Sequence, residues 1–249
     1  MSSDPQSDPA STYDAIIIGG GPAGLTCAIF LSRYRRPVLV VDAGHPRNYA
    51  SRGVHGFLGQ HGILPGELLK RGREEAEISG VEFVDARVEK IEKVGDVFHV
   101  WTDGDRCRVG RRIILAYGVR DTLPDDIPEF AKFYGRGIYH CPDCDGYEIS
   151  DKRVGVIGWG KAPVGLSLKL RQWSDQLTIF THGHERGWDA EENSKLLAES
   201  IGVKDERIVA FDEKDGALIG VVLATGESVP LDAIFFTIKV ERSCNLAER

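Results

Sequence analysis

Three glycines near the start of the chain restrict its fold more than any other feature. Gly19, Gly21 and Gly24 follow the apolar run 13–18 and have the spacing G-x-G-x-x-G. Such a run is typical of a buried parallel strand. The first glycine permits a tight turn, the second lets the backbone approach a pyrophosphate, and the third lets the next helix pack closely on the strand. The sequence therefore predicts a βαβ unit with a dinucleotide site at this turn.

The residues after the turn support the same site. Pro22 and Ala23 fall in the first turn of a predicted helix that ends near Tyr34. A second predicted strand, residues 38–41, ends in Asp42, about 20 residues after the glycines, where a carboxylate can bind adenosine ribose hydroxyls. A glycine turn without a ligand is the alternative. The succession of strand, glycines, helix, strand and acid favours the dinucleotide site.

The same pattern recurs later in the chain. Apolar residues 154–157 lead into Gly158 and Gly160, and a helix over 162–173 and a strand over 177–180 are predicted to follow. The chain is therefore predicted to be an α/β protein with two Rossmann-like βαβ nucleotide-binding domains.

The second nucleotide site has weaker support from its residues. Pro163 replaces the third small residue of the motif. The tip of the following strand, residues 181–184, has neither an acid for a free ribose nor an arginine for a 2′-phosphate. Lys161 and His184 are candidates for a phosphate contact. These residues leave open whether NAD(P)H binds at the second turn.

Between and after these two patterns the hydrophobic spacing predicts further elements. The predicted elements are a helix over 65–79, strands over 81–84, 87–94, 113–118 and 233–238, a hairpin that turns at residues 103–104, and a linker over 124–128.

A loop rich in glycine and histidine is predicted between Gly44 and Gly62. It is interpreted either as a loop near a ligand or as a solvated connection, and both interpretations stay open. Its polar residues are His45, Arg47, Asn48, His55 and His61.

Two cysteines separated by two residues are the strongest chemical signal. Cys141 and Cys144 can close a small disulfide ring and reopen it as a dithiol, which is two-electron chemistry. Half of a zinc site is the alternative, but tetrahedral zinc needs four ligands and Cys27, Cys107 and Cys244 are isolated. We therefore predict a redox pair and no metal site.

Composition excludes several classes of function. The net charge of −7 disfavours nucleic acid and anionic membranes as partners. No apolar run reaches the roughly 18 residues that a membrane helix needs. Five cysteines with one close pair are unlike a secreted disulfide scaffold, so we expect a cytoplasmic protein. Residues 1–12 are rich in Ser, Asp and Pro and are predicted to be a disordered tail.

The order of these motifs resembles the low-molecular-weight thioredoxin reductases among the flavin-dependent pyridine nucleotide-disulfide oxidoreductases. The resemblance rests on the glycines at 19, 21 and 24, a strand that ends at Gly118, and C-x-x-C-D-G directly before a second βαβ unit. It covers residues 13–238. It implies an FAD-binding domain over 13–118 and an NAD(P)-binding-like domain over 119–249 that carries the redox cysteines.

The resemblance also implies roles for individual residues. FAD would contact the first glycine turn, Asp42 and Gly118, and NADPH would be the electron donor if the second turn binds it. Cys144 would face the flavin, Cys141 would attack an external disulfide, and Asp145 would exchange a proton with the thiols. The implied partner is a thioredoxin-like protein or a small disulfide or dithiol, and the implied assembly is a homodimer.

Departures from the family pattern keep two alternatives open. Tyr117 stands where the family usually has threonine, Lys239 and Ser243 stand where it has glycine and proline, and the chain ends at Arg249 before the family's return segment to FAD. One alternative is the family branch that oxidises small dithiols with oxygen, using FAD and no nicotinamide. The other is a truncated, non-catalytic remnant.

Overall fold

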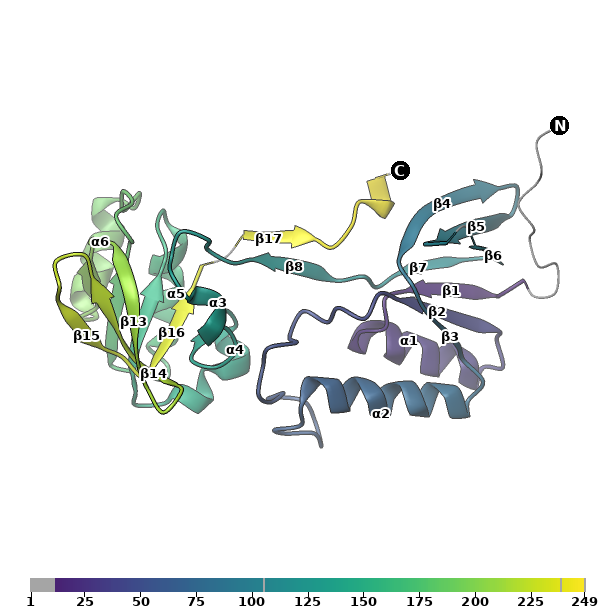
Figure 1. Ribbon diagram of the computed structural model, residues 1–249, viewed down its shortest axis with the longest axis horizontal. Coiled ribbons are helices and arrows are strands. Elements are labelled where there is room, and N and C mark those ends of the chain that lie inside the picture. The colour runs from purple at the N-terminus through teal and green to yellow at the C-terminus, as the bar shows by residue number, and fades with distance from the viewer. Residues whose placement is uncertain (1–11, 105, 238, 249) are drawn as a thin grey trace. The chain divides into compact units, whose positions relative to one another are not determined.

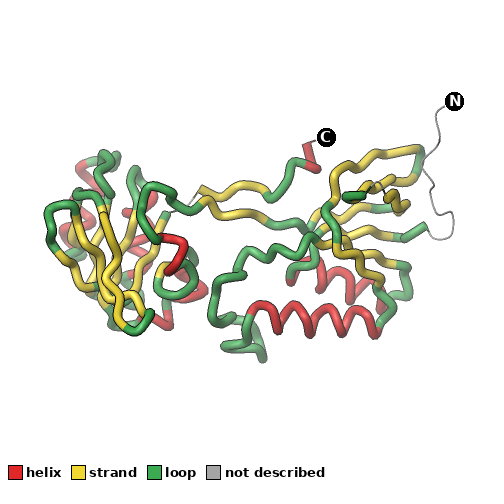
Figure 2. Tube along the Cα trace, viewed as in Figure 1, coloured by secondary structure: helices red, strands yellow, loops and turns green. Residues whose placement is uncertain are grey.

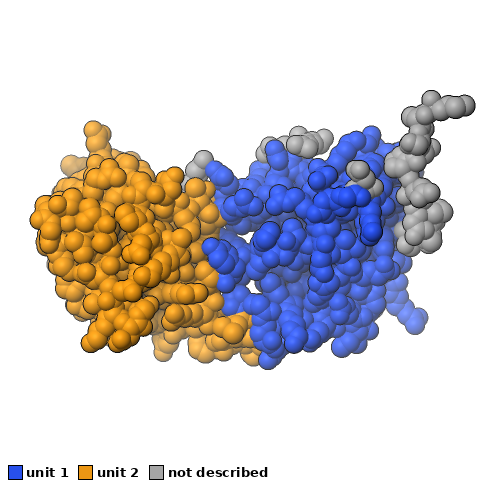
Figure 3. Space-filling view, viewed as in Figure 1, with its two compact units in different colours: residues 1–49, 65–120, 241–249 blue, residues 50–64, 121–240 orange. Residues whose placement is uncertain are grey.

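The structure is a computed structural model and describes residues 12–104, 106–237 and 239–248. Except for Thr12, the tail predicted to be disordered lies outside the described residues. The chain forms two compact units (Figure 3): residues 1–49, 65–120 and 241–249 make unit 1, and residues 50–64 and 121–240 make unit 2. The predicted domain boundary after residue 118 lies near the passage into unit 2, whereas residues 50–64 and 241–249 are grouped across it.

Unit 1 is built on a four-stranded parallel sheet (Figure 1). All four residues of the inner strand β1 (Ala15–Ile18) are buried, because both faces of the sheet are covered. Ile16 and Ile18 pack on the side of an antiparallel sheet, and Ile17 packs on the side of two helices. The strand order is β3 (Glu82–Asp85), β2 (Val38–Asp42), β1 (Ala15–Ile18) and β7 (Ile113–Leu115).

Two helices cover one face of this sheet, and a small antiparallel sheet lies over the other (Figures 1 and 2). Ala28 and Ala76 are fully buried on the helical side, where small side chains let the helices pack closely on the sheet. The helices are α1 (Pro22–Arg33) and α2 (Pro65–Ile78), and the antiparallel strands are β4 (Val88–Val94), β5 (Val97–Thr102) and β6 (Arg106–Gly110).

Unit 2 repeats this architecture with a five-stranded parallel sheet. Phe235 packs on the side of helices α5 (Ala162–Leu170) and α6 (Ala190–Ala198), whereas Ile234 and Phe236 pack on the opposite side. The strand order is β12 (Gly202–Lys204), β11 (Gln176–Phe180), β10 (Arg153–Ile157), β16 (Ala233–Phe236) and β9 (Ile138–Tyr139).

The opposite side of that sheet is covered by a helical turn and a three-stranded antiparallel sheet. Phe130, Phe133 and Phe211 from these elements lie in contact there, and Phe130 packs edge-on against Phe236. The elements are α3 (Phe130–Phe133), β13 (Ile208–Lys214), β14 (Ala217–Leu223) and β15 (Ser228–Pro230).

The structure corrects the prediction of a linker over residues 124–128. Ile127 is 2% exposed and belongs to the core of unit 2. In this part of the chain the passage into unit 2 lies within β8 (Val119–Thr122) and the return to unit 1 within β17 (Lys239–Arg242), and these two strands pair with each other. Within the described ranges, no helix is long and apolar enough to cross a membrane.

Candidate functional site

The first glycine turn brings three backbone segments into contact at the carboxyl end of the unit 1 sheet. A Cβ on Gly24 would overlap the Gly19 carbonyl oxygen, and a Cβ on Gly19 would overlap the Ala116 carbonyl oxygen that follows β7. Gly19 also has φ +110°, which disfavours any other residue. A Cβ on Gly21, by contrast, would meet open space. The turn is therefore closed on the protein side and open on the side where a ligand would approach.

The open side of the turn has the properties of an anion site. Gly21 is the N-cap of α1, no side chain caps this end, and no acid lies in the first turn. The N-terminal N–H groups therefore carry unopposed partial positive charge. Pro22 and Ala23 are exposed, and the Asp42 carboxyl lies 2.9 Å from the position of a Cβ on Gly20. These residues fit the pyrophosphate and ribose of a dinucleotide. Gly118 follows β7 with φ +67° and open space around it.

The second glycine turn also packs its first glycine against the segment that follows a neighbouring strand. A Cβ on Gly158 would overlap the Thr237 side chain that follows β16, just as Gly19 meets the segment after β7. Gly160 has φ +70°, and a Cβ on Gly187 would lie 2.9 Å from the Gly160 Cα. The backbone therefore fits a nucleotide-binding turn, with a second loop packed beside it.

The side chains around the second turn are held by partners within unit 2. Lys161 is paired with Asp189 and Glu192, so the candidate phosphate contact already has two carboxylates. His184 stacks on Trp159 with ring centroids 3.8 Å apart. The side chains therefore match NAD(P)H less well than the backbone does.

An arginine that the sequence analysis missed lies in the same loop. Arg186 donates to both carboxylate oxygens of Asp205, with a shortest distance of 2.7 Å. His182 is buried, and its Nδ1 accepts the Ile208 N–H at 3.0 Å. Burial lowers the pKa of His182, so this imidazole is a neutral structural group. Both side chains support the loop.

The redox cysteines lie at the start of a single helical turn, α4 (Pro142–Asp145). They form a disulfide, with Cα atoms 5.2 Å apart. Cys141 is the N-cap, and its Sγ accepts the Cys144 N–H at 3.2 Å. The same N–H would stabilise a thiolate on Cys141 after reduction. Cys141 is half-buried and Cys144 is exposed.

Charged and aromatic neighbours fix the segments on either side of the pair. Asp143 is mostly exposed and accepts a hydrogen bond from Lys169 of α5 at 2.7 Å, which offsets its charge beside the sulfurs. Before the pair, Tyr134 donates to Asp121 at 2.8 Å, and its hydroxyl lies 3.1 Å from His140 Nδ1. His140 is therefore part of a polar cluster that holds the end of β9.

Asp145 has the largest upward pKa shift near the pair. The pKa of this carboxyl is raised to about 6: burial is the largest cause, His55 opposes the rise, and Glu148 adds a smaller upward contribution. Asp145 therefore retains its proton to higher pH than an ordinary aspartate. A carboxyl with such a pKa can deliver or accept a proton near neutral pH.

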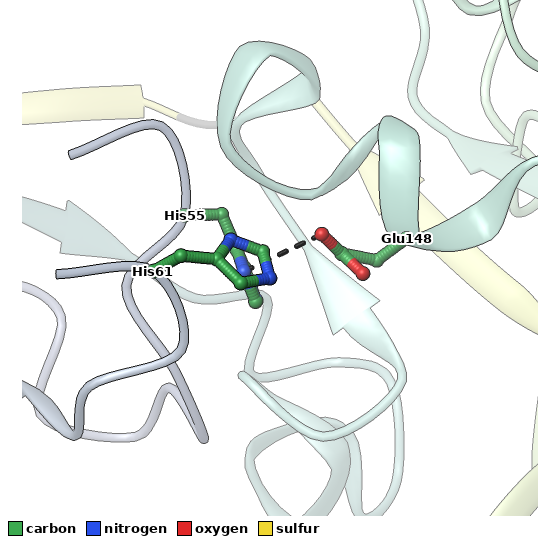
Figure 4. Close-up of side chains that lie close together, drawn as sticks. All are labelled: His55, His61 and Glu148. Atoms are coloured by element: carbon green, nitrogen blue, oxygen red, sulfur yellow. Dashed lines mark ion pairs between the residues drawn. The ribbon is translucent and has the colours of Figure 1, made fainter. Parts of the chain in front are cut away.

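The histidine-rich loop contributes to this region. His55 and His61 lie side by side, with ring centroids 5.1 Å apart, and the Glu148 carboxylate is directed toward them (Figure 4). Glu148 comes from η1 (Tyr147–Ile149), the 3₁₀ turn directly after α4. His55 Nδ1 lies 3.4 Å from Glu148 Oε1. His55 and His61 therefore lie in unit 2 beside Glu148, whereas His45 is exposed in unit 1.

The residue after Asp145 is required to be small. A Cβ on Gly146 would lie 2.5 Å from the Pro142 carbonyl oxygen and 2.7 Å from the Trp173 ring. Trp173 therefore packs directly on the backbone that follows the redox helix. The last residue of the C-x-x-C-D-G motif is therefore restricted both by Pro142 within the motif and by Trp173 outside it.

Comparison with known proteins identifies the family. The model of the family described as "Pyridine nucleotide-disulphide oxidoreductase" matches residues 13–249. The chain belongs to this family. The resemblance seen in the sequence and the α/β fold with two nucleotide-binding units are thereby confirmed.

Relatives and solved structures agree with this assignment. A "Probable thioredoxin reductase" of Arthroderma benhamiae is 33% identical over 188 residues, covering 73% of this chain and 46% of that protein. A "Thioredoxin reductase" of Bacillus subtilis is 30% identical over 191 residues, covering 76% of this chain and 57% of that protein. The chain thus spans about half of the length of these curated relatives.

Among solved structures, the chain is similar to HlmI, with a TM-score of 0.92 and 34% identity over 98% of this chain and 77% of that one. An oxidoreductase from Agrobacterium tumefaciens has a TM-score of 0.85 and 36% identity over 96% of this chain and 79% of that one. Thioredoxin reductases of this family use FAD and NADPH. In this chain the first turn fits FAD, whereas the second fits a nucleotide by its backbone alone.

Replacing Gly146 with alanine should destabilise unit 2 by about 1–3 kcal/mol, because the new Cβ overlaps Trp173 and the Pro142 carbonyl. Gly165→Ala is the matched control: Gly165 is exposed within α5 with open space around it, so a Cβ should stabilise by about 0.5–1 kcal/mol. Urea unfolding measures both. Equal shifts in the two variants would contradict the packing of Trp173 on Gly146.

The raised pKa of Asp145 predicts a pH-dependent free energy of unfolding. The folded state binds this proton more tightly than the unfolded chain, so stability should fall as pH rises from about 4 to about 6 and stay reduced above that. Asp145→Asn should remove this loss and be more stable than the parent at pH 7.5. Chemical unfolding of the oxidised protein between pH 4 and 8 measures the slope, with Asp143→Asn as the control for removing a carboxylate from the same helix. An unchanged slope in Asp145→Asn would refute the assignment.

Proposed function

We propose that the protein is an FAD-dependent thiol-disulfide oxidoreductase of the thioredoxin reductase type. The observation that carries the proposal is the Cys141–Cys144 disulfide at the start of α4, directly before the second βαβ unit. The first glycine turn supports it, because its open side and uncapped helix end suit a dinucleotide. FAD, when bound there, would supply two-electron transfer to and from the cysteine pair. Gly19, Gly21, Pro22, Ala23, Gly24, Asp42 and Gly118 are the residues proposed to hold it.

The cysteines would carry out thiol-disulfide exchange. In the reduced protein the Cys141 thiolate attacks an external disulfide, which forms a mixed disulfide and releases one thiol. Cys144 then attacks Cys141, which closes the internal disulfide and releases the second thiol. The Cys144 N–H that now points at Cys141 Sγ supports Cys141 as the attacking thiolate. Two electrons and two protons pass to the substrate in each cycle.

Asp145 is proposed to move the proton that accompanies this exchange. Its pKa of about 6 lets the carboxyl donate a proton to a departing thiolate and recover it near neutral pH. The substrate class is a thioredoxin-like protein or a small disulfide. We place the activity in the cytoplasm, because five cysteines with one close pair suit a reducing compartment.

The second candidate function is oxidation of small dithiols without nicotinamide. The pairing of Lys161 with Asp189 and Glu192 at the second turn favours it, because a nucleotide phosphate would have to compete with these carboxylates. In this direction the internal disulfide accepts electrons from a dithiol, and oxygen is the final acceptor. The same cysteines would serve both directions.

Loss of one redox cysteine should separate cofactor binding from turnover. The purified protein should be yellow, and Cys144→Ser should lower disulfide or dithiol turnover by at least about a hundredfold while the flavin absorbance remains. Cys107→Ser, at a free cysteine in unit 1, is the control and should retain turnover. A colourless protein that FAD cannot reconstitute would contradict the proposal and favour a non-catalytic remnant.

Anaerobic addition of NADPH should distinguish the two directions. If the protein is a reductase, NADPH bleaches the flavin absorbance within the mixing time of the experiment. If it is a dithiol oxidase, NADPH leaves the spectrum unchanged, whereas a small dithiol bleaches it and oxygen restores it. Lys161→Ala should weaken any NADPH response, and failure of both donors to bleach the flavin would contradict both candidates.

A further inference from the structure

His55 and His61 are held by a closed loop. Val54 and Ile63 form an isolated antiparallel bridge, in which the Val54 N–H donates to the Ile63 carbonyl at 2.8 Å. The Gly62 N–H donates back to Val54 at 2.9 Å. Both histidines lie just inside this bridge, so the backbone fixes them on one small loop.

The His55 ring is seated on glycine backbone. A Cβ on Gly53 would lie 3.3 Å from His55 Cε1 and Nε2, so the absence of a side chain there makes room for the imidazole. Its Nδ1 is shielded from solvent and, among the described residues, has no hydrogen-bond partner. This nitrogen lies 3.4 Å from Glu148 Oε1 and has hydrogen-bonding capacity that the described residues leave unused.

Glu148 reaches the two histidines from a separate, anchored element of the same unit. Its neighbour Ile149 is 2% exposed and packs in the core of unit 2. The start of the loop is anchored too, because a Cβ on Gly135 would meet the Ala50 backbone at 2.5 Å. All three side chains therefore converge from segments that are each tied to unit 2.

The donor set is that of a transition-metal site. One ring nitrogen from each histidine and one carboxylate oxygen from Glu148 lie within 4.8 Å of one another. Zinc binds imidazole nitrogen and carboxylate oxygen at about 2.0–2.2 Å, so a common ion needs these atoms to approach by roughly 1 Å. His61 and Glu148 are exposed and can make that adjustment by side-chain rotation.

We propose that His55, His61 and Glu148 bind a divalent transition-metal ion of the zinc type, with a fourth position open to water or another ligand. Two imidazoles and one carboxylate favour such ions over Mg²⁺ and Ca²⁺, which take oxygen ligands. The cysteine-based zinc site rejected from the sequence is a different site. Here the disulfide stays intact and supplies no ligand.

The ion would join the histidine loop to the redox segment. Glu148 follows Cys144 by four residues, and the loop is distant from both in sequence. A ligand that binds only the folded unit stabilises it in proportion to its affinity and concentration. Bound zinc would therefore raise the unfolding temperature of the oxidised protein and hold η1 directly behind α4.

The test uses the full chain with the Cys141–Cys144 disulfide intact and Zn²⁺ in competition with a chromophoric chelator. We expect one site per chain, and at least about tenfold weaker binding in both His61→Ala and Glu148→Gln. Glu148→Gln keeps the side-chain size, so it tests the ligand without a packing change. His45→Ala, at an exposed histidine of unit 1, is the control and should bind zinc like the parent.

Zinc X-ray absorption gives a second, independent readout. The expected spectrum has nitrogen and oxygen neighbours, imidazole scattering and no sulfur. Sulfur in the first shell would assign the ion to a cysteine, such as Cys107 beside His99 at 3.7 Å, and would overturn the proposal. The proposal would also be overturned if both variants bound Zn²⁺ as tightly as the parent, or if the parent bound no Zn²⁺. The cluster would then be only a His55–Glu148 ion pair.

Discussion

The contact between helix α1 and the turn that precedes it is the constraint on which unit 1 depends. Gly24 lies so close to the Gly19 carbonyl that no side chain fits between them, and Gly19 likewise leaves no room for a side chain beside Ala116 after β7. Backbone meets backbone at both places, so the helix end and two strand ends converge without intervening side chains. The free N–H groups of α1 then face the open side of the turn. An anion site results from packing alone, before any charged side chain is added.

At both glycine turns the first glycine packs against the segment that follows a neighbouring strand, but the contact is with backbone at Gly19 and with the Thr237 side chain at Gly158. Around the second turn Lys161 is paired with carboxylates and Trp159 stacks on His184. Solvent screens these exposed ion pairs, so they would weaken nucleotide binding by a modest factor and would not block it. A nucleotide phosphate at the second turn would therefore have to displace Asp189 and Glu192 from Lys161.

Features encoded by neighbouring residues could be predicted from the sequence. The glycine spacing, the apolar strands and the C-x-x-C pair each depend on a few consecutive residues, and the fold class followed from their order. Contacts between distant segments left no such pattern. Nothing near Gly146 indicates Trp173, and nothing near Glu148 indicates His55 and His61. The prolines on either side of Ile127 favour a linker. Its apolar side chain is instead buried in the core of unit 2.

The carboxyl groups beside the cysteine pair lie in two different electrostatic environments. Residues 143–148 include three carboxyl groups, and in the proposed exchange the cysteine sulfurs beside them would become thiolates. Asp143 is offset by Lys169, and Glu148 faces His55. Asp145 has no such cation in hydrogen-bond contact among the described residues, and burial keeps its proton on to about pH 6. A protonated carboxyl adds no negative charge beside a thiolate, and it holds the proton that a departing thiolate requires. In the exchange proposed above, burial of this one carboxyl would therefore lower the electrostatic cost of forming the thiolate while Asp145 is protonated, and the same proton would be available for that step.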